Sequence, residues 1–308
     1  MSFILLGILN SQAAGGAGGG VAGYIAGGGT FDTPTTTVDK FAFPDDTRTT
    51  LATGLSGARS FMAGFSNAGV AGYVAGGSND RDVGLVSTVD KFAFPSDSRT
   101  TLATGLSTSR NGPAGFFDIG VAGYAAGGDN PPSTRRDTVD KFAFPSDSRT
   151  TLGTGLGEAL REGEGFSDTG VAGYYGGGFN NSGQQKRTVY KFAYPADTRT
   201  TLAATLSVDR EGSGSFADYG VAGYFAGGSN SSSVDKFAFP SDTRSVLGTG
   251  LTVATSSTHG FANPGTAGYT PVDDATQTLN KFAFPTDTRS TSTSLSSSRN
   301  FISGFQDA

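Results

Sequence analysis

The sequence predicts an all-β fold built from six similar units, and three observations carry this prediction. A tyrosine recurs roughly every 50 residues, and a phenylalanine follows it within each unit. The tyrosines are Tyr24, Tyr73, Tyr124, Tyr174, Tyr224 and Tyr269, and the phenylalanines are Phe41, Phe92, Phe142, Phe192, Phe237 and Phe282. From each of the first five phenylalanines to the next tyrosine the distance is 32 residues. No segment has the helical period, and a repeat of this length is typical of propellers and solenoids.

Four strand-like segments make up each unit, and the second unit shows them in order. Residues 69–77 form the first segment, and residues 88–94, rich in β-branched and aromatic side chains, form the second. Residues 95–98 read Pro-Ser-Asp-Ser, which favours a turn because proline fixes φ and aspartate can bond its own backbone. Residues 99–104 and 110–116 form the third and fourth segments.

Variation in length is confined to one loop of the unit. The distances from tyrosine to phenylalanine within successive units are 17, 19, 18, 18, 13 and 13 residues. This variable loop follows the double glycine that ends the first segment. We therefore expect a rigid frame with one solvent-exposed rim, because loops that vary in length lie at the surface.

The two ends of the chain complement each other. The first unit begins near residue 21 and lacks its own fourth segment, whereas residues 299–305 supply that segment at the other end. A ring closed by the last strand explains this arrangement, since closure leaves only short protected edges. We predict a six-bladed β-propeller with four strands per blade over residues 21–308, with residues 1–20 as an apolar leader and Gly/Ala hinge.

Composition excludes several classes of function. The 308 residues carry a net charge of −5, which gives no electrostatic case for binding nucleic acid. The chain has no cysteine and a single histidine, His259, so thiolate and multi-histidine metal sites are excluded. No catalytic set emerges, because most aspartates recur with the repeat. We therefore expect no cofactor, no metal and no enzymatic activity.

The leader carries an apolar run that is too short to span a bilayer. Its apolar residues are Phe3, Ile4, Leu5, Leu6, Ile8 and Leu9. We expect no membrane span, and we interpret residues 1–14 as an arm that docks on a partner protein. Packing against its own propeller, a secretory signal and disorder are the alternatives.

Five basic residues break the repeat pattern. They lie in the variable loops of the second, third and fourth units: Arg81, Arg135, Arg136, Lys186 and Arg187. These loops are neighbours in a propeller, so they predict a rim patch that binds a surface glycan or a receptor. The alternative is that they are ordinary solvated loops. Glu164 and His259 share one slot of the fourth segment, and if that slot faces the central channel we expect them to meet there with a cation or water. The alternative is that they line a wet channel without chemistry.

Charges present once per unit are interpreted as structural. Each turn arginine follows an aspartate by two positions, as in Asp97 and Arg99, which indicates an ion pair within the turn or to the next blade. A second set of arginines is assigned to the fourth segments: Arg59, Arg110, Arg161, Arg210 and Arg299. We expect Phe92 and Phe94 to fill space left by alanine and glycine on the neighbouring blade.

The double glycine Gly76-Gly77, the aromatics Phe92 and Phe94, and Arg110 occupy positions that resemble the Kelch repeat, and the likeness covers residues 21–308. The tryptophan of the Kelch pattern is replaced by leucine at five positions: Leu51, Leu102, Leu152, Leu202 and Leu247. The repeated phrase DKFAFPSDSRTTL and the opening SFILLGILNSQAAGG are similar to glycine-rich propellers among virion proteins of bacteriophages and cyanophages.

This resemblance implies a structural or binding protein of a phage particle, in the tail, a fibre or associated with the capsid. Such a protein would take part in assembly or host attachment, with other virion proteins as partners through residues 1–14. A secreted or cell-surface glycan-binding propeller is the first alternative. A carbohydrate-active enzyme is the second, and it needs two carboxylates across a cleft.

Overall fold

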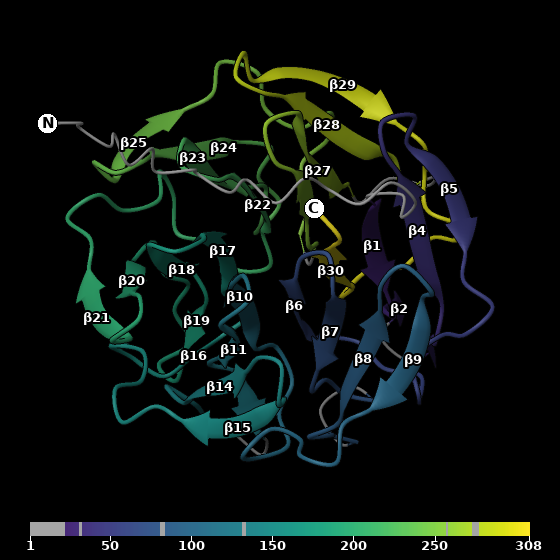
Figure 1. The fold of residues 1–308 in the computed structure, drawn as a ribbon. Helices are drawn as coiled ribbons and strands as arrows, with labels where there is room; N and C mark the ends of the chain where they lie inside the picture. The colour runs from purple at the N-terminus through teal and green to yellow at the C-terminus, as the bar shows by residue number, and fades with distance from the viewer. Residues whose placement is uncertain (1–21, 31–32, 81–83, 131–133, 257, 273–276) are drawn as a thin grey trace, which may run out of the picture.

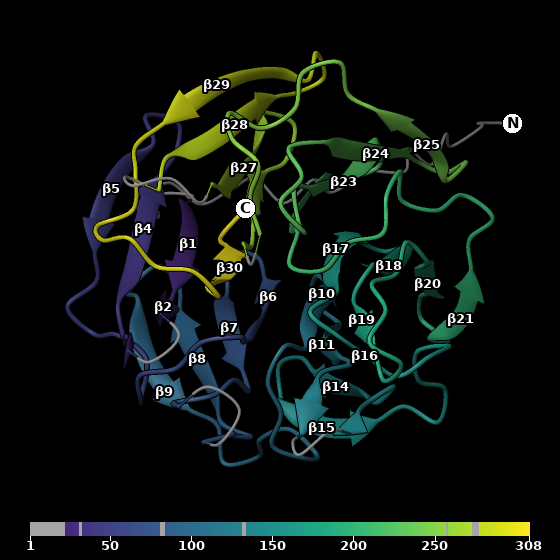
Figure 2. The ribbon, with the colours of Figure 1, turned by 180° about the vertical axis from the view of Figure 1, so that it is seen from behind.

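Six four-stranded antiparallel sheets form a closed ring in the structure, which is a computed structural model (Figures 1 and 2). It describes residues 22–30, 33–80, 84–130, 134–256, 258–272 and 277–308. The described residues contain strands and turns and no helix. The predicted six-bladed propeller is therefore confirmed, and the six innermost strands surround its central axis.

Within each blade, the first strand named lies nearest the axis and the last lies at the outside. Blade 1 contains β30 (Ser303–Gln306), β1 (Ala22–Ala26), β4 (Val38–Ala42) and β5 (Thr47–Thr50). Blade 2 contains β6 (Ala63–Asn67), β7 (Ala71–Ala75), β8 (Val89–Ala93) and β9 (Ser98–Thr101). Blade 3 contains β10 (Ala114–Asp118), β11 (Ala122–Ala126), β14 (Val139–Ala143) and β15 (Ser148–Thr151).

The second half of the ring repeats this order. Blade 4 contains β17 (Glu164–Asp168), β18 (Ala172–Gly176), β20 (Val189–Ala193) and β21 (Thr198–Thr201). Blade 5 contains β22 (Gly214–Asp218), β23 (Ala222–Ala226), β24 (Val234–Ala238) and β25 (Thr243–Val246). Blade 6 contains β26 (Phe261–Asn263), β27 (Ala267–Pro271), β28 (Leu279–Ala283) and β29 (Thr288–Ser292). Three two-stranded ribbons in the loops are β2 (Gly29–Thr30) with β3 (Thr33–Pro34), β12 (Asp129–Asn130) with β13 (Thr134–Arg135), and β16 (Leu160–Arg161) with β19 (Phe179–Asn180).

Blade 1 is assembled from both ends of the chain, as the sequence predicts. The last strand, β30, pairs antiparallel with β1, and Tyr24 lies opposite Phe305. The strands are shorter than predicted. In blade 2, β7 corresponds to the segment predicted at residues 69–77, but it ends at Ala75 because Gly76 and Gly77 have φ values of 70° and 103°, outside the β region.

A phenylalanine of each innermost strand packs against a glycine of the next blade. A Cβ atom on Gly123 would overlap the ring of Phe65, so the phenylalanine occupies the space that the glycine leaves. The six pairs are Phe305 with Gly72, Phe65 with Gly123, Phe116 with Gly173, Phe166 with Gly223, Phe216 with Gly268, and Phe261 with Gly23. The sequence assigned this role to Phe92 and Phe94, which instead pack beside Phe305, with ring centroids 5.6 and 6.4 Å away.

A Tyr–Asp–Lys group also joins each blade to the next. Asp97, in the outer turn of blade 2, accepts hydrogen bonds from the Tyr24 hydroxyl and the Lys40 ammonium of blade 1, both at 2.7 Å. The remaining groups are Tyr73, Lys91 and Asp147; Tyr124, Lys141 and Asp197; Tyr174, Lys191 and Asp242; Tyr224, Lys236 and Asp287; and Tyr269, Lys281 and Asp46. The predicted bridge between blades is confirmed, but its cation is a lysine. Arg99 lies 3.5 Å from Asp90 of its own blade instead of pairing with Asp97.

Four blades contain a fully buried arginine–aspartate pair. In blade 3, Arg110 Nη1 lies 2.9 Å from Asp140 Oδ2, and neither side chain is exposed to solvent. The other three pairs are Arg59 with Asp90, Arg210 with Asp235, and Arg299 with Asp39.

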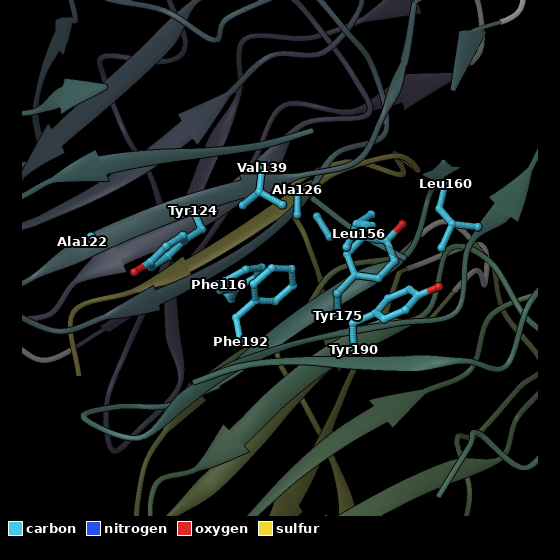
Figure 3. Close-up of a cluster of buried hydrophobic side chains, with 11 residues drawn as sticks. Phe116, Ala122, Tyr124, Ala126, Val139, Leu156, Leu160, Tyr175, Tyr190 and Phe192 are labelled. Atoms are coloured by element: carbon cyan, nitrogen blue, oxygen red, sulfur yellow. The ribbon is translucent and has the colours of Figure 1, made fainter. Parts of the chain in front are cut away.

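Blades 4 and 6 replace both members of the pair together. In blade 4, Leu160 stands six residues before the inner-strand phenylalanine, where blade 3 has Arg110, and Tyr190 stands where blade 3 has Asp140. Figure 3 shows Leu160 beside Tyr175 and Tyr190, in one buried cluster. Arg161 was therefore wrongly assigned to the inner set, because it is displaced by one residue and contacts Asp129 and Glu162 instead. In blade 6 the corresponding residues are Thr255 and Asn280.

We predict that Asp140→Ala lowers the free energy of unfolding by about 3–5 kcal/mol, because it leaves the buried Arg110 charge uncompensated. The double variant Arg110→Leu/Asp140→Tyr, which copies blade 4, should recover more than half of that loss. Chemical denaturation monitored by circular dichroism measures both. A double variant no more stable than Asp140→Ala would contradict the interpretation that the arginine–aspartate pair and the leucine–tyrosine pair are equivalent in stability.

Acid should destabilise the ring through the same pairs. Burial alone would raise the pKa of Asp39, Asp90 and Asp140, but the adjacent guanidinium and hydrogen bonds from serine and threonine outweigh it and hold each pKa below its usual range. As the pH falls, these three aspartates are therefore protonated at a higher pH in the unfolded chain than in the folded protein. We expect the stability that the pairs contribute to be complete above about pH 4, near the ordinary aspartate pKa, and to decline below it. Urea denaturation between pH 2 and 6 measures this, and Arg110→Leu/Asp140→Tyr should show a shallower decline.

Candidate functional site

The double glycines, the variable loops and the beginnings of the innermost strands lie at one end of the blades. In blade 1, the last residue of β1, Ala26, lies opposite the first residue of β30, Ser303, and the first residue of β4, Val38. We call this end the top face. The predicted single rim of variable loops is thus the edge of the top face, and the central axis opens in its middle.

A small hollow occupies the top of the axis, and we call it the axial hollow. Water-sized molecules have about 20 Å³ of room in it. Its lining residues come from all six blades and include aromatic, acidic and small side chains: Phe61, Gly112, Pro113, Glu162, Gly163, Glu164, Gly212, Thr258, His259 and Phe301. The rings of Phe61 and Phe301 stack with centroids 4.0 Å apart, and both side chains are half-buried.

Backbone hydrogen bonds link the blades around the mouth of this hollow. Each of five residues donates its N–H to a carbonyl of the adjacent blade, at 2.8 to 3.3 Å. The bonds run from Phe61 to Phe301, Gly112 to Phe61, Glu162 to Gly112, Gly212 to Glu162, and Thr258 to Gly212. Phe61, Glu162 and Phe301 adopt φ values of 59°, 53° and 56°. Such conformations are strained for residues with a side chain and persist where surrounding contacts enforce them, often at functional sites.

Glu164 and His259 meet across the axis, as the shared slot predicted. Glu164 Oε1 lies 3.0 Å from His259 Nε2. Glu164 begins β17 of blade 4, whereas His259 precedes β26 of blade 6, and blade 5 has only Gly214 at this position. Burial raises the pKa of Glu164, and the neighbouring His259 opposes that rise without cancelling it. A buried carboxyl with a shifted pKa beside an imidazole can exchange a proton with a bound molecule.

The Glu164–His259 pair separates the axial hollow from a lower chamber, since both residues line the two cavities. Water-sized molecules have about 40 Å³ of room in the chamber. Gln306 donates a hydrogen bond of 2.7 Å to the Tyr219 hydroxyl among its lining residues. Glycines of the innermost strands let neighbouring backbones approach closely around this chamber. A Cβ atom on Gly115, for example, would overlap the carbonyl of Gly64 in the neighbouring blade.

The predicted rim patch contains a groove beside Phe179, which we call the rim groove. It has about 570 Å³ of room and is lined by Phe179, Gly183, Gln184, Gln185, Lys186 and Asp209. Two guanidinium groups lie over the Phe179 ring, with Arg135 Cζ at 4.6 Å and Arg161 Cζ at 5.7 Å from its centroid. Arg161 also contacts Glu162 at 3.3 Å, so the rim groove and the axial hollow are neighbours on the top face.

The structure brings together part of the predicted basic patch. Lys186 pairs with Glu158 at 3.3 Å, and the exposed Arg187 pairs with Asp209 at 3.7 Å. Arg136 forms a backbone bridge to Leu160. Arg81 lies outside the described residues, as do Phe3, Ile4, Leu5, Leu6, Ile8 and Leu9 of the proposed docking arm. The sequence interpretation missed Phe179 and Thr258, because neither recurs in the other units.

Within the described ranges, no group of three or more metal-binding side chains gathers at one point. The described part of the chain also contains no helix of the length and apolarity needed to cross a membrane.

Comparisons with known proteins support the fold. No family model matches the sequence, and no curated protein does. The chain is similar to a solved structure titled "Structure of YjhT", with 14% identity and a TM-score of 0.67, over 89% of this chain and 98% of that one. Because 594 solved chains match, the fold is too common to identify a function by itself.

The expectation that the chain is not an enzyme is corrected at this point. It rested on the lack of a catalytic set in the sequence, in which most aspartates recur with the repeat. The likeness to YjhT spans nearly the whole propeller, and one fold hosts enzymes as well as binding proteins. The Glu164–His259 pair further supplies a buried acid–base pair that the repeat does not dictate. Enzymatic activity is therefore among the functions for which the chain has to be tested.

We predict that His259→Ala raises the pKa of Glu164 further, because the imidazole is the group that lowers it. The side-chain carboxyl carbon of Glu164 should titrate at higher pH in the variant than in the wild type. Carbon-13 NMR measures this, with Glu164→Gln to assign the resonance among the four glutamates. An unchanged or lower titration midpoint would show that the two side chains do not interact in solution.

Proposed function

We propose that this propeller binds a neutral, hydroxyl-rich surface glycan through the rim groove of its top face. The observation that carries the proposal is the half-buried Phe179, which has the guanidinium groups of Arg135 and Arg161 over its ring and lies in a groove lined also by Gln184 and Gln185. Aromatic rings supply rigid contact area for an apolar face, and amide and guanidinium groups hydrogen-bond hydroxyls. Ligand sites commonly combine these features.

Charge favours a neutral glycan over a polyanion. Lys186 and Arg187 are each paired with a carboxylate, and Arg161 lies 3.3 Å from both Asp129 and Glu162. The protein as a whole carries a net charge of −5. Three of the four cations beside the rim groove are thus paired with carboxylates, and a polyanion would gain little from them. The fourth, Arg135, lies over the Phe179 ring.

The setting we propose is a phage particle, in which a Kelch-like propeller serves assembly or host attachment. The repeated phrase at residues 90–102 supports this, together with the apolar leader.

We expect the wild-type protein to bind neutral glycans on an array and Phe179→Ala to bind at least about tenfold more weakly. That loss corresponds to roughly the worth of one aromatic contact, about 1.5 kcal/mol. Val121→Ala is the matched control, because Val121 is 44% exposed and precedes β11 on the opposite face. Absence of any neutral-glycan hit, or equal loss in both variants, would remove the proposal.

The particle setting has a separate test. Deletion of residues 2–14 should prevent incorporation of the protein into particles while leaving its glycan binding and its thermal unfolding unchanged. Particle incorporation is measured by quantitative mass spectrometry of purified particles. Normal incorporation of the truncated protein would exclude the docking role.

A carbohydrate-active enzyme on the same face is the second candidate function. The Glu164 carboxyl favours it, because it lies 3.0 Å from His259 and burial raises its pKa, and a carboxyl with a raised pKa can act as a general acid. Glycans that bind should then be converted by the wild type and left intact by Glu164→Gln. Conversion at an equal rate by both proteins would exclude this role for Glu164.

A further inference from the structure

The innermost strand of each blade lies at the edge of its sheet, so one row of its backbone groups has no neighbouring strand to bond. At one position, directly after the inner-strand phenylalanine, a side chain of the next blade takes over. Ser167 Oγ accepts a hydrogen bond of 2.8 Å from the N–H of Phe117, and Ser66 Oγ accepts one of 2.9 Å from the N–H of Gln306. The amide oxygen of Gln306 accepts one of 2.6 Å from the N–H of Ala262. The backbone at this position therefore points toward the next blade and needs an acceptor there.

The other three blades lack this acceptor, because Phe117, Ala217 and Ala262 occupy the accepting position of the blade that follows. Two of the N–H groups concerned are those of Ser167 and Ala217. Both residues line the lower chamber, and they are only 1% and 5% exposed. Buried N–H groups in native proteins are paired, and ordered water pairs them where no protein acceptor is near.

The lower chamber also presents side chains that bond water. Glu164 and His259 form its upper end, and the Tyr219 hydroxyl, which accepts a hydrogen bond of 2.7 Å from Gln306, belongs to its lining. Donors and acceptors thus share one small space. A cation would meet the two backbone N–H donors, and no group of three or more metal-binding side chains gathers in the described ranges. Water both donates and accepts, so it suits this lining better than a cation does.

An independent observation comes from the axial hollow, on the other side of the Glu164–His259 pair. Thr258 lines this hollow and is only 3% exposed. Its Oγ1 atom is buried and has no hydrogen-bond partner among the described residues. Native structures seldom leave such a hydroxyl unsatisfied, and an unseen water is a common explanation.

The room in the two cavities fits a few waters and little else. One bound water needs about 10–15 Å³ on the measure that gives about 40 Å³ for the lower chamber and about 20 Å³ for the axial hollow. The lower chamber therefore has room for about two or three waters and the axial hollow for about one.

We propose that the lower chamber binds two or three ordered waters and the axial hollow one, and that these waters hydrogen-bond the Glu164–His259 pair from both sides. Water can donate to the pair or accept from it, so the site persists whichever side chain carries the proton. Protons then reach the pair through either cavity. The proposal does not rest on glycan binding at the rim groove, and it holds whether or not Glu164 acts as a general acid.

Two variants of the intact protein test the two cavities separately. Ala217→Ser copies Ser167, so its hydroxyl should accept from the N–H of Ser167 and displace one water from the lower chamber. Thr258→Val keeps the shape of the side chain but removes the hydroxyl, and it should release the water of the axial hollow. Oxygen-17 magnetic relaxation dispersion counts long-lived internal waters in solution, and each variant should lower the count by one.

Ala103→Ser is the matched control, because it makes the same substitution at an exposed position of blade 2 and should leave the count unchanged. A high-resolution crystal structure of the wild type should show waters within hydrogen-bond distance of the N–H groups of Ser167 and Ala217. That structure also decides the matter if a variant fails to fold.

Three outcomes would overturn the proposal. The first is a lower chamber that contains no water in the wild-type crystal structure. The second is anomalous scattering from rubidium in the lower chamber of crystals soaked in rubidium chloride, which would identify a cation site instead. The third is a water count that is the same in Ala217→Ser, Thr258→Val and Ala103→Ser.

Discussion

The contact on which the ring depends is the insertion of an inner-strand phenylalanine into the space beside a glycine of the next blade. Phe65 against Gly123 is one of six such contacts around the axis. A side chain on the glycine would hold the blades apart, and a smaller residue in place of the phenylalanine would leave a cavity. Interiors tolerate little change in volume, so these two residue types fix the spacing of the blades and the narrow waist of the channel. The Tyr–Asp–Lys groups hold the same blades together nearer the outside.

Within this frame, one position of the blade holds three different residue pairs. Four blades bury an arginine with an aspartate, blade 4 buries Leu160 with Tyr190, and blade 6 has Thr255 with Asn280. Buried ion pairs and apolar pairs of similar volume can be nearly equal in stability, which explains why both persist in one molecule. Blades 4 and 6, which lack the arginine–aspartate pair, also supply Glu164 and His259 to the axis. The blades that differ from the repeat are thus the ones that carry the polar pair beneath the top face.

Much of the fold was predictable because the repeat acts as its own alignment. Closure by β30 followed from a strand missing at one end and present at the other, and the Glu164–His259 contact followed from a shared slot. The placement of Arg161 failed because blade 4 shifts its arginine by one residue, and Leu160 gives no polar signal. Phe179 was missed because variable loops have no equivalent in other units. The left-handed backbone at Phe61 carries no sequence signal either, since phenylalanine rarely adopts it.

The position of β30 has a consequence for biosynthesis. The innermost strand of blade 1 is synthesised after the strands of all other blades, so β1 waits without its inner partner while about 280 residues are made after it. During that time the nascent protein exposes an unpaired edge, which is a template for pairing with other chains. Polypeptides that end prematurely would keep this edge permanently. Cells that produce the protein at high levels would therefore be expected to accumulate aggregates of incomplete chains rather than soluble five-bladed fragments.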